Sequence, residues 1–157
     1  MINTGIAGAM GDNVGVLDVV ISKNVCYHDA DLDIFKKFPP YMEEYIADEK
    51  LIDHANKACE KVCDGSFKIH VGKIVTGDRF VTDSKIKKDI KERCKPLCIE
   101  MEGAAIAHTS VINEIPFIII RTMSDSADDS GEMDYDKFEI IAAKNSAMIV
   151  TDLIKNY

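Results

Sequence analysis

The sequence has 157 residues, a usual length for one domain. Hydrophobic residues make up 46% and charged residues 29%, which excludes disordered and collagen-like chains. The formal net charge of −8 repels a phosphate backbone, so it argues against nucleic acid as the partner and favours a small or neutral ligand.

Short β-branched runs alternate with helical stretches, a pattern typical of an α/β domain with a largely parallel sheet. In chain order the predicted elements are a strand over residues 17–22, a helix over 47–62, a strand over 67–75, a helix over 83–94, a strand over 96–100, a helix over 102–113, a strand over 116–123 and a helix over 135–154. The run Phe117-Ile118-Ile119-Ile120 is apolar on both faces, which places it at the centre of the sheet. Asp134 is the expected N-cap of the last helix.

The chain opens on residues 2–8, which read as the end of a strand that enters a glycine turn. Gly5, Gly8 and Gly11 would let the backbone approach a ligand closely, and a plain tight turn is the alternative. Neither a G-x-G-x-x-G fingerprint nor the lysine of a P-loop accompanies them. Because a parallel α/β domain normally begins with a complete strand and its crossover, we expect the first part of the sheet to lie upstream. Residues 1–157 are therefore expected to form a single partial domain.

The location of the chain is predicted from two absences in the sequence. No stretch has 18 uninterrupted apolar residues, and the start lacks a charged segment followed by an apolar core, so a cytoplasmic location is expected. Among the five cysteines, Cys59/Cys63 and Cys94/Cys98 stand four apart, which fits one helix face better than a zinc site. We expect ordinary buried thiols in a reducing compartment.

Two acidic segments contain residue types that bind metals, and neither segment is predicted to bind a metal. His28 lies between Tyr27 and two carboxylates, Asp29 and Asp31, but a hydrogen-bonded loop explains this segment better because no further ligands lie nearby. The segment over residues 125–132 lacks the alternating ligand positions of an EF-hand loop.

Polar and aromatic residues follow the ends of three predicted strands. Phe80 follows the strand over 67–75, Glu102 follows the strand over 96–100, and Asp125 follows the strand that contains Arg121. Open α/β sheets bind ligands at the carboxyl ends of their strands, and these side chains suit a flat base, sugar hydroxyls and a ring nitrogen. On the residues alone, Glu102 could equally be a first-turn residue favoured by the helix dipole, and Arg121 could simply pair with Asp125.

Five motifs occur in the order typical of one family. They are Ile2-Asn3-Thr4-Gly5, Tyr27-His28-Asp29-Ala30-Asp31, Thr76-Gly77-Asp78-x-Phe80, Glu100-Met101-Glu102-x-Ala104-Ala105-Ile106-Ala107 and Arg121-x-x-Ser124-Asp125-x-Ala127. Through them essentially the whole chain resembles the 5′-methylthioadenosine/S-adenosylhomocysteine nucleosidases. The resemblance implies a purine nucleoside phosphorylase-like α/β fold: three layers, with a mostly parallel or mixed central sheet flanked by helices, here N-terminally truncated.

The resemblance also implies an activity and the residues that carry it. The activity is that of an N-glycosyl hydrolase of methionine salvage, which uses water to release adenine from methylthioadenosine and adenosylhomocysteine, without metal or organic cofactor. Asp125 would protonate the leaving adenine at nitrogen 7, and Arg121 would order the water or Glu102. The implied substrate-binding residues are Phe80, Val81, Met101, Glu102, Ser124, Ala7 and Gly8. Tyr27 and His28 would lie near the interface of a homodimer and complete the neighbouring pocket.

The chemistry explains this division of roles. Cleavage of the bond between sugar and base develops positive charge on the ribose and negative charge on the base. Asp125 would discharge the base by protonation, while Glu102 would stabilise the sugar cation. A free aspartate has a pKa of about 3.9, so this role requires that the pKa of Asp125 be raised by desolvation or by the purine.

This sequence departs from the family pattern in two respects. Family members carry a further segment upstream with a glutamate that acts as the base for the water, and Ile6 stands where the family often has a small hydroxyl residue. Two alternatives therefore stay open: a phosphorylase of the same fold, and a truncated, non-catalytic fragment of the nucleosidase. Loss of a general base costs about 10²–10⁴-fold in rate.

Overall fold

The computed structural model describes residues 1–128 and 131–156. The strands are β1 (Ile2–Ala9), β2 (Val19–Tyr27), β3 (Tyr45–Ile46), β4 (Ile69–Thr76), β5 (Cys98–Glu100) and β6 (Ile118–Asp125). The helices are α1 (Leu32–Phe35), α2 (Glu49–Val62), α3 (Ser84–Cys94), α4 (Gly103–Ile112) and α5 (Gly131–Lys155). Every predicted strand and helix is present, with ends that differ by a few residues.

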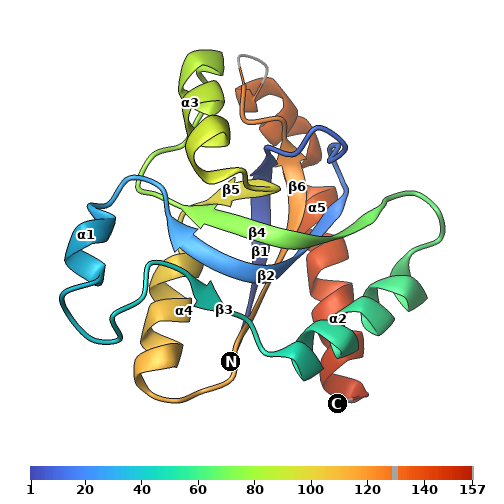
Figure 1. Ribbon diagram of the computed structural model, residues 1–157. Coiled ribbons are helices and arrows are strands. Elements are labelled where there is room, and N and C mark those ends of the chain that lie inside the picture. The colour runs from blue at the N-terminus through green and yellow to red at the C-terminus, as the bar shows by residue number, and fades with distance from the viewer. Residues whose placement is uncertain (129–130, 157) are drawn as a thin grey trace.

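The strands form one mixed sheet in the order β3-β2-β4-β5-β1-β6. β1 with β6, β2 with β4 and β4 with β5 are parallel pairs, whereas β1 with β5 and β2 with β3 are antiparallel. β2 also pairs with β6 in antiparallel register, so the sheet curls round and closes on itself. α2 and α5 pack together, with α5 on β1 and β6, while α4 packs on β2, β3 and β4 (Figure 1). The predicted α/β fold with a mixed sheet between helices is confirmed.

β6 runs through the centre of the molecule, as its apolar sequence predicts. All eight of its residues are buried, and Ile118, Ile119 and Ile120 have no exposed surface. A strand covered on both faces loses the alternation of polar and apolar residues, because neither face meets water. The polar residues at its end, Arg121 to Asp125, are buried with it.

The start of the chain differs from the prediction. β1 is a complete strand of eight residues that runs through Gly5 and Gly8, so the expected glycine turn at this point is wrong. At both glycines, polar side chains of β6 pack directly against the backbone of β1. A Cβ atom on Gly5 would lie 2.2 Å from an Arg121 guanidinium nitrogen, and one on Gly8 would lie 2.8 Å from an Asp125 carboxylate oxygen. The glycines therefore make room for the polar end of β6.

Three further details correct the sequence prediction. α5 begins at Gly131, so Asp134 lies inside the helix and is not its N-cap. α1 has four residues and β3 has two, and neither was predicted because such short elements carry no hydrophobic period. The five cysteines are free thiols: Cys26, Cys59 and Cys98 are buried as expected, whereas Cys63 and Cys94 are partly exposed. Cys94 ends α3 and Cys98 lies in β5, so the predicted shared helix face of this pair is wrong. No helix in the described part of the chain combines the length and apolar character needed to cross a bilayer.

A buried carboxylate, Asp18, joins the start of β2 to β4. It accepts hydrogen bonds from the backbone N–H groups of Gly15 (3.0 Å) and Lys68 (2.8 Å), and it pairs with the Nε2 atom of His70 (2.9 Å). Burial acts to raise the pKa of Asp18, but these hydrogen bonds and the charge of His70 act to lower it, and the net shift is below the ordinary value of 3.8. The carboxylate therefore stabilises the fold above that ordinary value and loses this effect as the pH falls through its folded pKa.

We expect Asp18→Asn to lower the free energy of unfolding by about 1–3 kcal/mol at pH 7, because an amide cannot accept all three hydrogen bonds. Urea unfolding at pH 7 and below pH 3.8 would measure this loss, which should shrink at the lower pH as the wild-type carboxylate takes up a proton. Asp12→Asn is the control, since that side chain is 84% exposed. Equal unfolding free energies for wild type and Asp18→Asn at pH 7 would contradict the role.

Candidate active site

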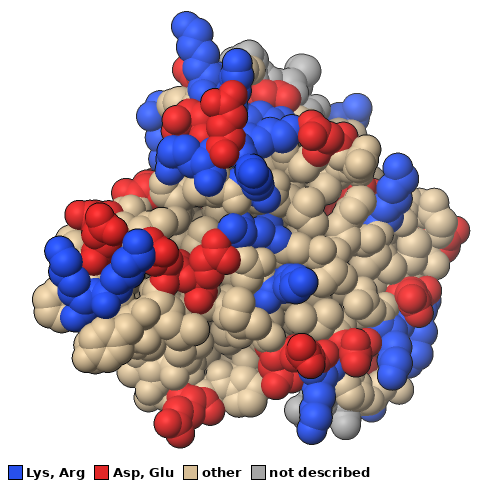
Figure 2. All heavy atoms as spheres, in the orientation of Figure 1, with Lys and Arg blue, Asp and Glu red and all other residues tan. Residues whose placement is uncertain are grey.

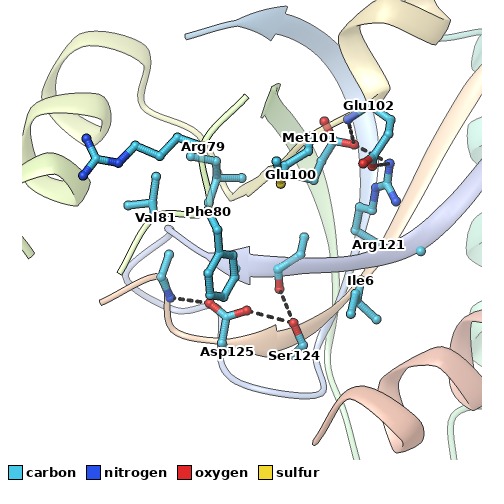
Figure 3. A pocket seen from close by; sticks show the side chains of 15 residues that line it. Ile6, Arg79, Phe80, Val81, Glu100, Met101, Glu102, Arg121, Ser124 and Asp125 are labelled. Carbon is cyan, nitrogen blue, oxygen red and sulfur yellow. Dashed lines mark hydrogen bonds and ion pairs between the residues drawn. The ribbon is translucent and has the colours of Figure 1, made fainter. Parts of the chain in front are cut away.

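The ends of β1, β5 and β6 and the loop after β4 surround one pocket of about 320 Å³ (Figure 3). Its lining includes all nine residues that the sequence assigned to catalysis or substrate binding at these strand ends. They are Ala7, Gly8, Phe80, Val81, Met101, Glu102, Arg121, Ser124 and Asp125. Ile6 lines the same pocket. β4 and β5 are parallel, so their carboxyl ends lie at the same edge of the sheet. β1 and β6 form a second parallel pair, and the antiparallel pairing of β1 with β5 and of β2 with β6 closes the sheet and brings the two pairs together around the pocket.

Asp125 is the last residue of β6 and is only 1% exposed. One carboxylate oxygen accepts a hydrogen bond from the Ser124 hydroxyl (2.8 Å), and the other accepts one from the backbone N–H of Ala127 (2.7 Å). Ala127 has a positive φ of 50°, which turns the chain back so that its N–H group reaches the carboxylate. These contacts fix the direction in which the carboxyl group of Asp125 points.

Phe80 and Val81 form the wall of the pocket that lies nearest Asp125. The Phe80 ring lies next to the Asp125 side chain in Figure 3 and keeps 43% of its surface exposed. Val81 is buried and packs in one apolar cluster with Ile90 and Ala127. The loop leads directly into α3, whose N-cap, Asp83, accepts hydrogen bonds from the first turn. A flat apolar ring and a buried carboxyl group thus face the same space.

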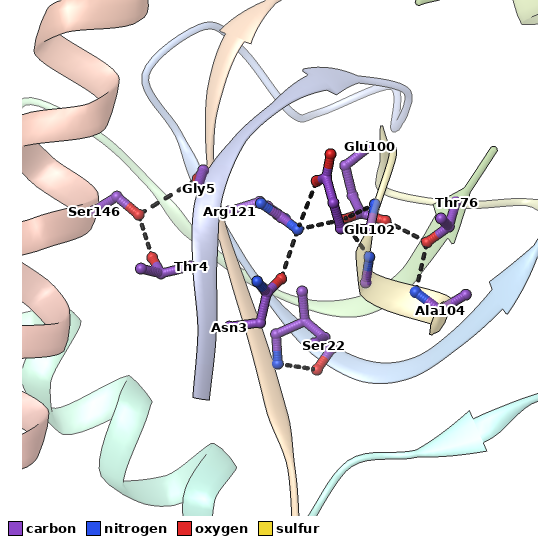
Figure 4. A network of polar contacts seen from close by, with 12 residues as sticks. Asn3, Thr4, Gly5, Ser22, Thr76, Glu100, Glu102, Ala104, Arg121 and Ser146 are labelled. Carbon is purple, nitrogen blue, oxygen red and sulfur yellow. Dashed lines mark hydrogen bonds and ion pairs between the residues drawn. The ribbon is translucent and has the colours of Figure 1, made fainter. Parts of the chain in front are cut away.

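A buried ion pair supports the other wall of the pocket. Glu100 and Arg121 pair through Oε2 and Nη2, with side chains 1% and 4% exposed. The same Glu100 oxygen accepts hydrogen bonds from the backbone N–H groups of Gly103 (2.7 Å) and Glu102 (3.2 Å). Its second oxygen accepts one from the Thr76 hydroxyl (Figure 4). Glu100 thus connects β4, β5, β6 and the start of α4.

Glu102 lies at the mouth of this network. Its side chain is 62% exposed, and its Oε2 atom is 3.5 Å from Nη2 of Arg121. Glu102 is the N-cap residue of α4, yet its side chain makes no capping hydrogen bond. Its place at the start of α4 agrees with the helix-dipole alternative, and its carboxylate also lines the pocket beside Arg121.

Sequence reasoning assigned no role to Glu100, Asn3 or Thr76. Asn3 accepts a hydrogen bond from Arg121 (2.6 Å), and the Thr76 hydroxyl oxygen accepts one from the Ala104 N–H (2.7 Å). All three stand in the family motifs, but the sequence carries no signal that separates a residue supporting the pocket from one facing it. The alternative in which Arg121 simply pairs with Asp125 is not what the structure shows, because Arg121 pairs with Glu100 and Glu102 instead.

Tyr27 and His28 lie away from this pocket. The Tyr27 ring stacks on Phe35, with ring centroids 5.2 Å apart, and His28 is buried beside Gly77. Burial lowers the pKa of His28, so its ring is neutral at pH 7. No group of three or more His, Cys, Asp or Glu side chains suited to a metal ion occurs among the described residues.

Comparison with known proteins agrees with the geometry of the pocket. Residues 1–155 match the family model described as Phosphorylase superfamily. The chain is 36% identical to the 5′-methylthioadenosine/S-adenosylhomocysteine nucleosidase of Shewanella pealeana, with 99% of this chain and 69% of the relative covered. The nucleosidase of an Exiguobacterium species is 38% identical, with 99% and 68% covered.

A solved structure gives the same result. The crystal structure of the Neisseria meningitidis nucleosidase in complex with methylthio-immucillin-A superposes with a TM-score of 0.91 at 38% identity, covering 99% of this chain and 69% of that one. The fold is that of the phosphorylase superfamily. Within that superfamily, the chain belongs to the family of the 5′-methylthioadenosine/S-adenosylhomocysteine nucleosidases.

Proposed function

We propose that this chain hydrolyses the N-ribosidic bond of 5′-methylthioadenosine and S-adenosylhomocysteine and releases adenine. The observation that carries the proposal is the position of Asp125. It is a buried carboxylate held by Ser124 and Ala127, and it lines one pocket with the Phe80 ring and with Glu102. An aromatic ring can stack on the base, a carboxylate can accept hydrogen bonds from the ribose hydroxyls, and a proton donor can assist cleavage of the bond between ribose and base. Hydrolysis needs these three groups around one small molecule.

On the base side, Asp125 acts as the general acid. The adenine ring stacks on Phe80, and the carboxyl group of Asp125 donates its proton to nitrogen 7 as the bond to the sugar breaks. Ser124 and Ala127 hold the carboxyl group at the ring edge, so little reorganisation is needed in the transition state. Val81 borders the purine edge.

On the sugar side, Glu102 accepts hydrogen bonds from the ribose hydroxyls and stabilises the developing cation, with Met101 against the sugar. Arg121 holds Glu102 and orders the attacking water, which adds to the sugar cation and releases its proton to bulk solvent. Its Nε atom is buried and has no hydrogen-bond partner in the described part of the chain, so it can donate to a water or substrate oxygen. Ala7 and Gly8 approach the ligand through their backbone.

The proposal extends to partners and location. We place Tyr27 and His28 near the interface of a homodimer, where they complete the pocket of the neighbouring subunit. Phe38 and Tyr41, in the segment that follows α1, are more than 60% exposed and supply apolar surface for that contact. The five free thiols fit a reducing, cytoplasmic compartment.

The test measures the binding of adenine to the chain and the release of adenine from a nucleoside substrate. We expect the purified chain to bind adenine in a calorimeter and to release free adenine from 5′-methylthioadenosine in a phosphate-free buffer. A rate that depends on added phosphate would instead identify a phosphorylase. A chain that neither binds adenine nor releases it would overturn the proposal.

A further inference from the structure

Lys87 connects α3 to the loop that follows β6. Its ammonium group donates a hydrogen bond to the backbone carbonyl of Ser126 and lies 3.6 Å from the carboxylate of Asp128. The Lys87 side chain is 23% exposed, so these contacts are partly shielded from water. The two contacts bracket Ala127, whose N–H group holds the carboxylate of Asp125. Lys87 therefore contacts the loop at Ser126 and at Asp128, on both sides of Ala127, whose N–H group orients Asp125.

Apolar packing joins the same parts of the molecule. Val81, Ile90 and Ala127 are buried in one cluster, and Ile86 packs against it. Val81 belongs to the loop that carries Phe80, Ile86 and Ile90 belong to α3, and Ala127 belongs to the loop after β6. Figure 1 shows α3 and the end of β6 at the same end of the sheet. α3 therefore supports both the loop that carries Phe80 and the loop that follows Asp125.

We propose that Lys87 is a positioning residue for the reaction: it holds residues 126–128 against α3 so that the carboxyl group of Asp125 meets the edge of a base stacked on Phe80. The proposal rests on the proposed function of the pocket. A displacement of an acid by about 1 Å is enough to cost about 10²-fold in rate, so a tether outside the pocket has a large effect. Asp128 balances the charge of the ammonium group, so the tether adds little net charge beside the acid.

Among the residues that the structure describes, the other ion pairs of α3 do not reach residues 126–128. Figure 2 shows basic side chains gathered over α3, but Arg93 pairs with Asp89 and Lys88 with Glu92, both within the helix. Lys91, one turn after Lys87, pairs with Asp12 in the segment after β1. Lys91 is therefore a matched control: it also joins α3 to another segment, without touching residues 126–128.

The experiment compares Lys87→Met, Lys87→Arg and Lys91→Met in the full chain. Methionine keeps the apolar stem but removes the ammonium group, whereas arginine keeps a donor and a positive charge. Hydrogen–deuterium exchange over residues 124–128 reports the loop directly, and calorimetry with adenine and adenine release from 5′-methylthioadenosine report the site. Unfolding in urea separates a local effect from a global loss of stability.

For Lys87→Met, we expect amide exchange over residues 124–128 to be about 10-fold faster or more, because a charge-assisted hydrogen bond is lost. We expect adenine affinity to fall and kcat to fall by about 10–100-fold, with a smaller change in KM. Lys87→Arg should restore most of each loss, and Lys91→Met should match wild type in all three.

The remaining outcomes would overturn either the role of Lys87 or the proposed function of the pocket. Equal exchange over residues 124–128 in Lys87→Met and wild type would overturn the role of Lys87, as would an effect explained wholly by lower global stability. Wild-type chain that binds no adenine would overturn the proposed function, while the exchange measurement still decides whether Lys87 holds the loop.

Discussion

Replacing Asp125 by Asn is expected to slow adenine release by about 10²–10⁴-fold while the chain stays folded. The amide can still accept the hydrogen bond from Ala127 and can donate to the Ser124 oxygen, so the local structure is retained. It has no acidic proton to give to the leaving base. The initial rate of adenine formation from 5′-methylthioadenosine measures the loss, and urea unfolding checks the fold.

Ser124→Ala is the matched control for this prediction. It removes the hydrogen bond from the Ser124 hydroxyl to Asp125 but leaves the carboxyl group, so we expect a smaller loss of rate than for Asp125→Asn. Near-normal turnover in Asp125→Asn would remove Asp125 from the mechanism. Adenine would then have to leave without protonation by this residue.

The largest expected effect on stability is that of Arg121→Met, about 3–5 kcal/mol of unfolding free energy. The substitution leaves the Glu100 carboxylate in the interior, 1% exposed, without its cation. Two backbone N–H groups and the Thr76 hydroxyl remain as its donors, but they do not neutralise the charge. Denaturant unfolding at pH 7 measures the loss.

Two controls decide whether the buried charge is the cause. The double variant Glu100→Gln/Arg121→Met removes both charges, and we expect it to recover a large part of the lost stability. Lys73→Met breaks the Lys73–Glu44 pair, which is more exposed, and should cost only about 0.2–1 kcal/mol. A loss from Arg121→Met no larger than that from Lys73→Met would show that the buried pair is not a major source of stability.

Much of the pocket lining was predictable because it follows the ends of predicted strands. The polar residues after the strands at 67–75, 96–100 and 116–123 were recognised from their place after apolar runs, and Phe80, Glu102 and Asp125 do line one pocket. β4 and β5 run parallel, so their carboxyl ends lie at one edge. The end of β6, which pairs with β2 in antiparallel register, meets them only because the sheet closes on itself. Tyr27 ends β2 and His28 follows it, and their proposed place beside a partner's pocket still depends on the family resemblance alone.

The two glutamates that follow β5 show what the sequence cannot distinguish. Glu100 and Glu102 are two residues apart, a spacing that puts side chains on one face of a regular strand. β5 ends at Glu100 and the chain bends at Met101 and Glu102, so the first side chain points inward to Arg121 and the second remains 62% exposed at the pocket. A sequence prediction of a single sugar-holding acid therefore missed the residue that supports it.

The sequence by itself determined the α/β class, the central position of β6 and the main helices. It also identified the motifs whose residues line the pocket. These are properties of hydrophobic period and of residue order, which act over short distances in the chain. Only the tertiary structure decided the closure of the sheet through β2 and β6, the pairing of Arg121 with Glu100, and the contact of Lys87 with the loop after Asp125. Those contacts join residues 21 to more than 100 positions apart, and their partners are chosen by how strands and helices pack in three dimensions.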